Sequence, residues 1–303
     1  MLQVVLLLIP LISFSQDLKV LSWNTYLLPP VNPLGIVKLF NDTHQEERAK
    51  EMAKKLEASD YEILFLQETF HKASRKKLEE GLSTKFPHHA YPKKKKFLTF
   101  TNSGLAVYSK HPMKVLEEIV FQHAKGSDKL ARKGAMLVEV ELPGGKKAQF
   151  VNTHLQAWNN QEAAEIRLQQ LEEIKEVMKR HKQEGVPQFI VGDLNIDGNK
   201  PIEFQEAIKL LEMEPSKLQG EIQVTNGYET PCFKNPGGEA GGEWLDHLFQ
   251  TSNYEIHSKV VPITGPLKYK DPKSKKLVCS DCLLSDHHAV EHVIKLSQQS
   301  SSK

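Results

Sequence analysis

Eight short, mostly apolar runs recur along the chain, and this repetition constrains its fold more than any other feature. Several of them are continuously apolar, as strands buried on both faces are. The loop Pro143-Gly144-Gly145 separates two of them, which predicts an antiparallel hairpin over 135–155 and therefore mixed sheets. The eight runs are 18–23, 62–68, 103–110, 135–142, 149–155, 188–195, 244–250 and 289–296.

Amphipathic helices are predicted between these strands. Thr43-His-Gln-Glu46 resembles a capping box and precedes a repeat of apolar residues at Ala49, Met52, Ala53 and Leu56. A second helix is predicted over 161–183, and a third begins near Pro201. Since both faces of each sheet need cover, we expect an α/β (α+β) fold, a four-layer sandwich of two packed mixed β-sheets flanked by helices.

The length of 303 residues, 39% of them hydrophobic, fits one large domain as well as two smaller ones. No linker forces a split, so we expect a single catalytic domain over 16–303. Residues 1–15 form an apolar stretch too short to span a bilayer, with small Ser13 and Ser15 at its end. It predicts a signal peptide cleaved after Ser15 and a secreted or periplasmic protein, although a basic n-region is missing and a hydrophobic strand is the alternative.

Charge and cysteine content restrict the function classes. The 40 basic and 38 acidic residues give a net charge of +2, without the cationic excess typical of proteins that bind nucleic acid, which disfavours a nuclease. Lys93-Lys94-Lys95-Lys96 is an exception and suits either a solvated loop or an anionic surface. Cys279 and Cys282 are close enough for a local disulfide, with Cys232 left over; a Cys-x-x-Cys pair could also bind zinc or do redox work.

Polar residues stand at the ends of several predicted strands. The strand at 189–195 ends in Asp193 and Asn195, which alternation points to one face. Carboxylate and carboxamide oxygens suit a hard cation such as Mg²⁺ beside a phosphate. Glu68 is the strongest candidate metal ligand, because a lone carboxylate after a buried strand is otherwise costly; capping the next helix is its alternative role. Asn24, His154, Asp246, Asp286 and His287 stand in similar settings.

In this order, these motifs resemble the endonuclease/exonuclease/phosphatase superfamily, whose founding fold is that of DNase I. The resemblance covers residues 18–294 and leans toward the neutral sphingomyelinases, which hydrolyse sphingomyelin to ceramide and phosphocholine. Thr-His-Leu-Gln-Ala before a helix with Arg167-Leu-Gln-Gln-Leu171 is similar to their central motif. Ser127–Gly134 also resembles a segment of the sphingomyelinases. The superfamily motifs are Asn24, Gln67-Glu68, Ser103–Lys110, Thr153–Ala157, Gly192–Asn195, Leu245-Asp246 and Ser285–His287.

Phosphodiester hydrolysis needs an activated water, a cation and donors for the phosphoryl oxygens. An imidazole oriented by a carboxylate can accept a proton near neutral pH, so His287 is the candidate general base. The resemblance implies that Asp246 orients it. His154 and Asn195 are the candidate donors, and Asp193 either orients the nucleophile or serves the leaving group. The resemblance also implies that Asp128 and Lys133 interact near the site.

The expected metal ligands are oxygen donors around one Mg²⁺, for which Mn²⁺ or Co²⁺ could substitute. Asn24 would arrange Glu68 and the metal or contact the phosphate, and Asp286 would ligate metal or support His287. The expected ligands are Glu68, Asn24, Asp193, Asn195 and Asp286.

The expected function is hydrolysis of sphingomyelin or a related choline phospholipid at a membrane surface, by a monomer that does not act on nucleic acid. The apolar segment 27–40 suits membrane contact or simple packing. Trp158, Tyr228 and Phe233 could hold a choline cation or be merely structural. The alternatives are a nuclease of the same fold, an inositol-phosphate phosphatase, and a catalytically silent membrane-binding scaffold.

Overall fold

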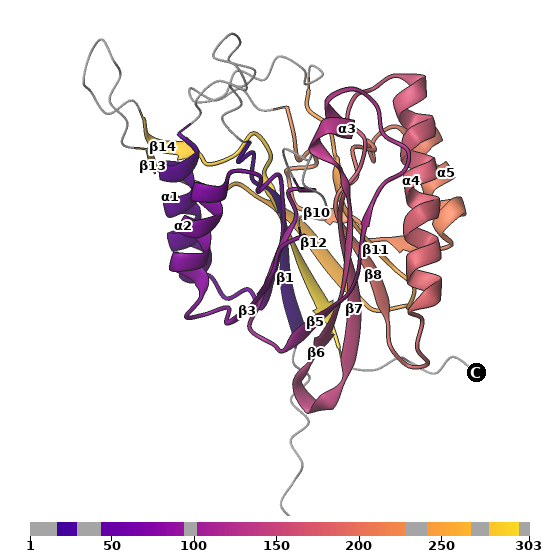
Figure 1. Ribbon diagram of the computed structural model, residues 1–303, viewed down its shortest axis with the longest axis horizontal. Helices are drawn as coiled ribbons and strands as arrows, with labels where there is room; N and C mark the ends of the chain where they lie inside the picture. Colours follow the sequence, from indigo (N-terminus) through magenta and orange to yellow (C-terminus); the bar gives the residue numbers. More distant parts are fainter. Residues whose placement is uncertain (1–16, 29–43, 94–101, 228–240, 268–278, 297–303) are drawn as a thin grey trace, which may run out of the picture.

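The computed structural model describes residues 17–28, 44–93, 102–227, 241–267 and 279–296. Two large β-sheets face each other in the middle of the molecule, and helices cover their outer faces (Figure 1). The predicted α/β sandwich of two mixed sheets between helical layers is confirmed.

The seven-stranded sheet contains the N-terminal strand at its centre. Its β1 runs parallel to β2 and antiparallel to β15, so strands from both ends of the chain lie side by side. In spatial order the strands are β10 (Leu218–Gln219), β12 (Ile256–Val261), β15 (Ala289–Lys295), β1 (Asp17–Asn24), β2 (Ile63–Gln67), β4 (Ala106–Ser109) and β3 (His88–Ala90).

The six-stranded sheet is built mainly from the middle of the chain. Its β7 and β8 are parallel neighbours, whereas β11 runs antiparallel to β8. In spatial order the strands are β5 (Met113–Val120), β6 (Gly134–Glu141), β7 (Lys147–His154), β8 (Gln188–Asp193), β11 (Asp246–Gln250) and β9 (Glu214–Pro215). A separate two-stranded sheet joins β13 (Thr264–Leu267) to β14 (Cys279–Leu283).

The helices form the two outer layers. α1 (Gln45–Glu57) and α2 (Lys72–Leu82) pack on the seven-stranded sheet, and α4 (Gln161–Arg180) and α5 (Pro201–Leu211) pack on the six-stranded sheet. The short α3 (Gly126–Ala131) connects β5 to β6 along the chain. A 3₁₀ turn, η1 (Pro143–Gly145), closes the hairpin of β6 and β7. These layers are visible edge-on in Figure 1.

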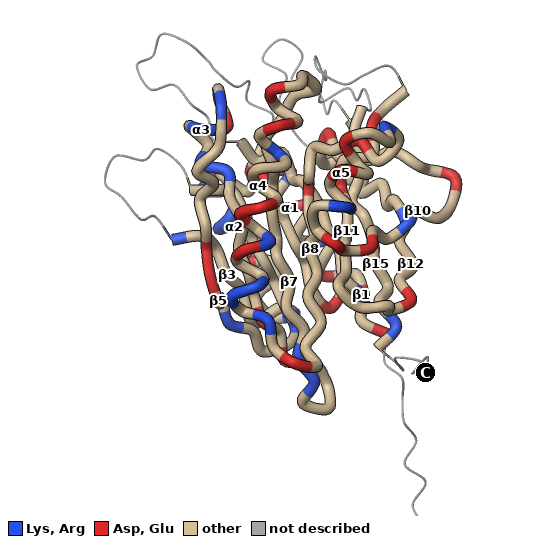
Figure 2. The backbone as a smooth tube through the Cα atoms, turned by 90° about the vertical axis from the view of Figure 1, so that its right-hand side faces the viewer, with Lys and Arg blue, Asp and Glu red and all other residues tan. Residues whose placement is uncertain are grey.

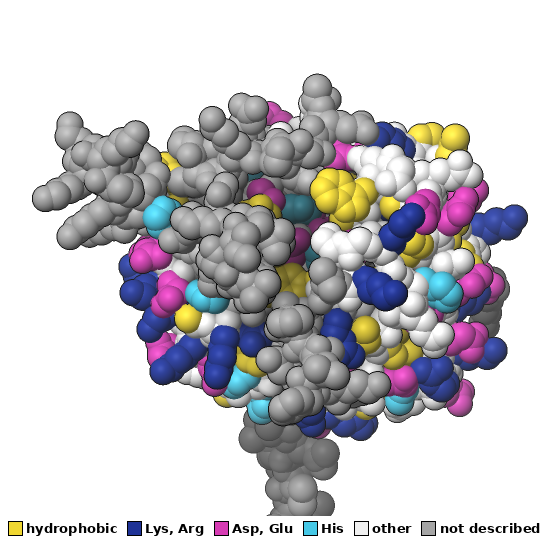
Figure 3. Space-filling view, turned by 45° about the horizontal axis from the view of Figure 1, so that its top comes forward, with side chains coloured by type: hydrophobic (Ala, Val, Ile, Leu, Met, Phe, Trp, Pro, Cys, Tyr) yellow, Lys and Arg dark blue, Asp and Glu magenta, His cyan; other side chains and the backbone are white. Residues whose placement is uncertain are grey.

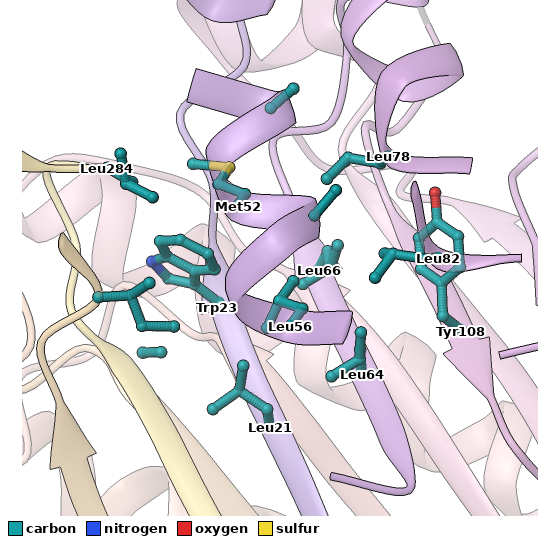
Figure 4. Close-up of a cluster of buried hydrophobic side chains, with 14 of the residues drawn as sticks. Leu21, Trp23, Met52, Leu56, Leu64, Leu66, Leu78, Leu82, Tyr108 and Leu284 are labelled. Atoms are coloured by element: carbon teal, nitrogen blue, oxygen red, sulfur yellow. The ribbon is translucent and has the colours of Figure 1, made fainter. Parts of the chain in front are cut away.

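Apolar side chains fill all three spaces between the four layers. Figure 4 shows the cluster under α1, where Trp23 lies near Met52 and Leu284. Between the sheets, the rings of Phe65, Phe150 and Phe189 follow one another, with centroids 5.1 Å and 4.8 Å apart. Burial of this extent keeps the ends of both sheets in a fixed relation, on which the site depends.

All eight predicted strands and the 135–155 hairpin are present, and the three predicted helices correspond to α1, α4 and α5. The long helix ends at Arg180, earlier than predicted. Cys279 and Cys282 form the local disulfide. The signal peptide, Thr43 of the capping box and Cys232 lie outside the described residues. No helix in the described part of the chain is long and apolar enough to cross a membrane.

Candidate active site

The ends of three neighbouring strands place His154, Asp193 and Asp246 in one row. His154 ends β7 and Asp193 ends β8, and the two residues are register partners. Asp246 begins β11 directly opposite Asp193. The parallel strands β7 and β8 end at the same edge of the sheet, and the antiparallel β11 begins at that edge, so the three side chains come together. All three are buried.

The facing sheet contributes Asn24 and Glu68 at the ends of its own parallel pair. Asn24 ends β1 opposite Gln67, which ends β2 just before Glu68. The two halves of the site touch, because Asn24 Nδ2 donates to Asp193 Oδ2 across a distance of 2.9 Å. The site therefore straddles the seam between the sheets. Acidic and histidine side chains lie together near the middle of the face that Figure 3 shows.

Asp246 and His287, 41 residues apart in the chain, form a buried pair. His287 Nδ1 lies 2.8 Å from Asp246 Oδ2, which leaves Nε2 on the side of Asp193 Oδ2, 3.7 Å away. Burial alone would lower the pKa of His287, but the carboxylates of Asp246 and Asp193 raise it well above its usual value. Trp23 Nε1 donates to the carbonyl of His287 at 3.0 Å and so fixes this segment to the core.

Glu68 and Asp286 are two neighbouring acidic groups whose negative charges repel each other. Burial and the charge of Asp286 raise the pKa of Glu68 to about 7, and burial also raises the pKa of Asp286. Glu68 Oε2 is buried and has no hydrogen-bond partner among the described residues. A buried carboxylate oxygen without a partner is costly unless a cation or water binds it.

These residues fit a hard divalent cation, which prefers several oxygen ligands. Asp193, Asp246 and His287 each offer an atom within 4.8 Å of the others, the one such group in the described part of the chain. Since His287 Nδ1 is already bonded to Asp246, the atoms left to a metal there are His287 Nε2 and oxygens of Asp193 and Asp246. Two buried carboxylate oxygens, Glu68 Oε2 on the facing side and Asp246 Oδ1, have no hydrogen-bond partner among the described residues, so both are open to a cation.

Lys133 holds the ring of His154, whose Nε2 accepts a hydrogen bond from it. Lys133 Nζ lies 2.8 Å from His154 Nε2, 2.6 Å from the carbonyl of Leu155 and 3.1 Å from Asp128 Oδ2. Burial and the charge of Lys133 lower the pKa of His154 to about 3, so the ring is neutral with its proton on Nδ1. That Nδ1 is buried and has no hydrogen-bond partner among the described residues.

A family model described as the Endonuclease/Exonuclease/phosphatase family matches residues 21–287, which include every candidate site residue. The chain belongs to this family. Within the family it is 24% identical over 300 residues to a sphingomyelinase C of Listeria ivanovii, covering 92% of this chain and 86% of the relative. It is also 24% identical over 266 residues to a phospholipase C of Staphylococcus aureus, covering 82% and 77% of the two chains.

Solved structures of family members confirm the fold. A sphingomyelinase C from Streptomyces griseocarneus superposes with a TM-score of 0.76 at 22% identity and covers 92% of this chain and 99% of its own. A mutant beta toxin from Staphylococcus aureus with bound magnesium ions also gives a TM-score of 0.76, at 21% identity, with the same coverage. The resemblance to DNase I-like proteins and to sphingomyelinases is thus confirmed.

The sequence analysis missed Arg48 and Tyr26, which support the site. Arg48 is fully buried and donates to the carbonyls of Thr25 and Leu284, both at 2.9 Å, and to that of Tyr26 at 2.5 Å. It therefore ties the loop after β1 to the segment before His287. Burial and the charges of Asp286 and Glu68 raise the pKa of Tyr26 to about 12. Arg48 lies one residue before Ala49, on the apolar stripe of α1, and this position was a usable signal.

Asn195 follows Asp193 with a φ of 51°, and it donates from its backbone to Asp193 Oδ1 at 2.9 Å and from Nδ2 to the carbonyl of Leu155 at 3.1 Å. Trp158 is 61% exposed. Most of the apolar segment 27–40, Lys94-Lys95-Lys96, Tyr228 and Phe233 lie outside the described residues.

Proposed function

We propose that this chain is a secreted, metal-dependent phosphodiesterase that hydrolyses sphingomyelin to ceramide and phosphocholine by attack of water at phosphorus. The observation that carries the proposal is the Asp246–His287 pair beside Asp193, with the acidic groups of Glu68 and Asp286 close to it. The relatives named sphingomyelinase C and phospholipase C support a phosphoric diester hydrolase. In this proposal residues 16–303 form one catalytic domain behind a cleaved signal, and the enzyme is a monomer.

His287 is the proposed general base and Asp246 the residue that orients it. With Nδ1 bonded to Asp246, the nitrogen available to a water is Nε2. The carboxylates of Asp246 and Asp193 raise the pKa of His287 and so favour its protonated form, and the base role requires that their charge be compensated. A cation bound by Asp193, Glu68 and Asp286 would compensate that charge, which makes metal dependence part of the proposal.

Glu68 is the proposed principal metal ligand, with Asn24 and Asp286 on the same side and Asp193 and Asn195 completing the set. When bound, Mg²⁺, or Mn²⁺ or Co²⁺ in its place, would neutralise phosphoryl charge and polarise the attacking water. Asn195 and His154 are the proposed donors to the phosphoryl oxygens, His154 through Nδ1, and Asp193 either orients the water or serves the leaving group. Asp128 and Lys133 are the proposed near-site pair.

A nuclease of the same fold is the closest rival, and it would need a basic surface for the phosphate backbone. Basic and acidic residues are interspersed over the side of the molecule in Figure 2, and the net charge is +2. This charge pattern favours a lipid over a nucleic acid. A silent scaffold is disfavoured because it has no need to keep Glu68 and His287 buried next to other charged groups.

The test is a substrate panel of sphingomyelin, phosphatidylcholine and lysophosphatidylcholine vesicles and plasmid DNA, each with Mg²⁺ or with EDTA. We expect release of phosphocholine from sphingomyelin in Mg²⁺ and its loss in EDTA. Nicked plasmid with intact lipid would establish the nuclease instead. Glu68→Gln and His287→Ala should each lower turnover by about 10²–10⁴-fold without unfolding the protein. Glu206→Gln at an exposed position and His257→Ala at a half-buried position on β12 are the matched controls.

A further inference from the structure

The segment 155–158, which follows β7 and His154, is held by side chains from several parts of the chain. Lys133 donates to the carbonyl of Leu155 at 2.6 Å. The backbone N–H of Gln156 donates to Gln170 Oε1 at 2.8 Å, and that of Ala157 donates to Asp128 Oδ2 at 2.6 Å. Tight capture of a loop backbone by side chains fixes its conformation, at the cost of ordering each partner.

Arg167 of α4 also binds the backbone of this segment, from the interior of the protein. Its side chain is 1% exposed and forms two parallel bonds with Glu203 of α5, Nε to Oε1 at 2.6 Å and Nη2 to Oε2 at 2.8 Å. The remaining Nη1 donates to the carbonyls of Gln156 at 3.0 Å and Trp158 at 2.7 Å. Only a planar guanidinium can pair with a carboxylate in this way and still reach two carbonyls, so lysine cannot replace it.

The residue at the end of this captured segment is Trp158, which projects into solvent. Trp158 is 61% exposed. Its backbone φ of 83° lies in the left-handed region, which residues other than glycine rarely adopt. A cavity of about 210 Å³ opens beside it, lined also by Lys125, Gln156, Asn160 and Ile166. A strained, fixed backbone under an exposed indole, four residues after His154, indicates that the ring is displayed for contact.

We propose that Arg167 is a positioning residue for substrate recognition, which holds Trp158 at the edge of the active site so that its indole contacts the choline-bearing head group of a phospholipid. This inference rests on the proposed function and deepens it. The indole face attracts a quaternary ammonium cation and suits the membrane interface. A side chain on an already ordered backbone loses less entropy on binding, so the Arg167–Glu203 pair raises affinity without touching substrate.

The first test separates lipid recognition from chemistry. Trp158→Ala, Arg167→Lys and Glu203→Gln are assayed on sphingomyelin vesicles and on soluble bis(p-nitrophenyl) phosphate. The expected result is an apparent KM on vesicles raised by about 5- to 30-fold, while kcat/KM on the soluble diester stays within about twofold. Trp158→Phe should restore most of the lost affinity. Val115→Ala removes an exposed apolar side chain on β5 and is the control, with wild-type values expected.

The second test measures binding without catalysis. In EDTA with phosphatidylcholine vesicles, the difference in emission between the wild type and Trp158→Phe reports Trp158 alone. It should shift to the blue on vesicle addition, and the shift should shrink in Arg167→Lys and Glu203→Gln. An unchanged vesicle KM in Trp158→Ala overturns the inference, as do equal losses of Arg167→Lys on both substrates, which indicate a merely structural role.

The two proposals fail in different ways. If no choline lipid is hydrolysed, the proposed function fails, but the emission shift still decides whether Trp158 contacts head groups. If Arg167→Lys does not fold, Glu203→Gln and Trp158→Ala carry the decision, and wild-type vesicle KM in both overturns the inference.

Discussion

Asp193 is a residue at which the two halves of the site meet. Its Oδ2 accepts from Asn24 of the facing sheet and lies 3.4 Å from His154 Nε2 and 3.7 Å from His287 Nε2. Its Oδ1 accepts from the backbone of Asn195. A carboxylate held from so many sides has one orientation, so it can fix the relative positions of the groups around it.

At the same scale, Lys133→Ala tests the buried Asp128–Lys133 pair. Both side chains are almost inaccessible, so removal of the lysine leaves the Asp128 carboxylate without its cation and His154 Nε2 without its donor. We expect a loss of about 3–5 kcal/mol in the free energy of unfolding, measured by urea denaturation, together with lower activity. Lys125→Ala breaks the exposed pair with Glu162 and should cost about 1 kcal/mol or less. Equal costs for the two variants would contradict the prediction.

Single residues also show what the sequence could and could not predict. Asn24, Glu68, His154 and Asp193 were predictable because each ends or directly follows an apolar strand. The contact of Asp246 with His287 was not, because no spacing pattern encodes a contact across 41 residues, and only the family resemblance implied it. The acceptor role of His154 Nε2 depends on where Lys133 lies in three dimensions, so it too could not be read from the chain.

Among the secondary-structure elements, β8 depends on a glycine directly before Asp193. Gly192 has a φ of 142°, and an added Cβ would lie 2.2 Å from the carbonyl oxygen of Thr153 on β7. Gly185→Ala meets no atom within 4 Å and should cost only the backbone strain of about 1–2 kcal/mol. Gly192→Ala should cost about 1–3 kcal/mol more and lower activity, because the strand must move and take Asp193 with it. Similar melting temperatures for the two variants would refute this account.

Glu139, on β6 of the six-stranded sheet, is another buried carboxylate. Burial acts to raise its pKa, but hydrogen bonds from Gln149, Lys147, Lys114 and Gln183 lower it to about 2. A carboxyl with a lowered pKa stabilises the fold above its unfolded value of 4.5, and this contribution disappears as the pH falls from there toward 2.

Glu139→Gln should therefore lower the free energy of unfolding at pH 7, by at most about 3 kcal/mol, and flatten its dependence on pH between 4.5 and 2. Denaturant titrations at a series of pH values measure both effects. Glu141→Gln, at an exposed position on the same strand, is the control and should leave the curve unchanged. A pH dependence that survives in Glu139→Gln would assign it to other groups.

Of the elements that the sequence did not predict, β5 and α2 were missed for identifiable reasons. β5 is partly exposed along its length, and its pairing with β6 shifts register between Val115 and Glu117, which breaks the period-two pattern. α2 buries only Ser74, Leu78 and Leu82, a stripe one residue wide in each turn, so its apolar periodicity is faint. The long, strongly periodic helices α1 and α4, by contrast, were both predicted.

At the scale of the whole molecule, metal binding should appear as thermal stability. A ligand that binds only the folded state stabilises it by about 2.7 kcal/mol at 100 times its dissociation constant, which corresponds to a rise of several degrees in Tm for a protein of this size. We expect this rise for the wild type on addition of Mg²⁺ after EDTA treatment, and for Glu206→Gln. Glu68→Gln should lose most of it. The same rise in Glu68→Gln would place the cation elsewhere.

The seam between the sheets has a consequence for the connectivity of the chain. The connection from β4 to β5 spans only residues 110–112, and it leaves Asn24 and Glu68 on one side and His154, Asp193, Asp246 and His287 on the other. Two fragments made by cutting there would each be catalytically incomplete. Turnover would return only when they reassociate, so the enzyme could serve as a complementation reporter whose signal depends on correct docking of its own halves.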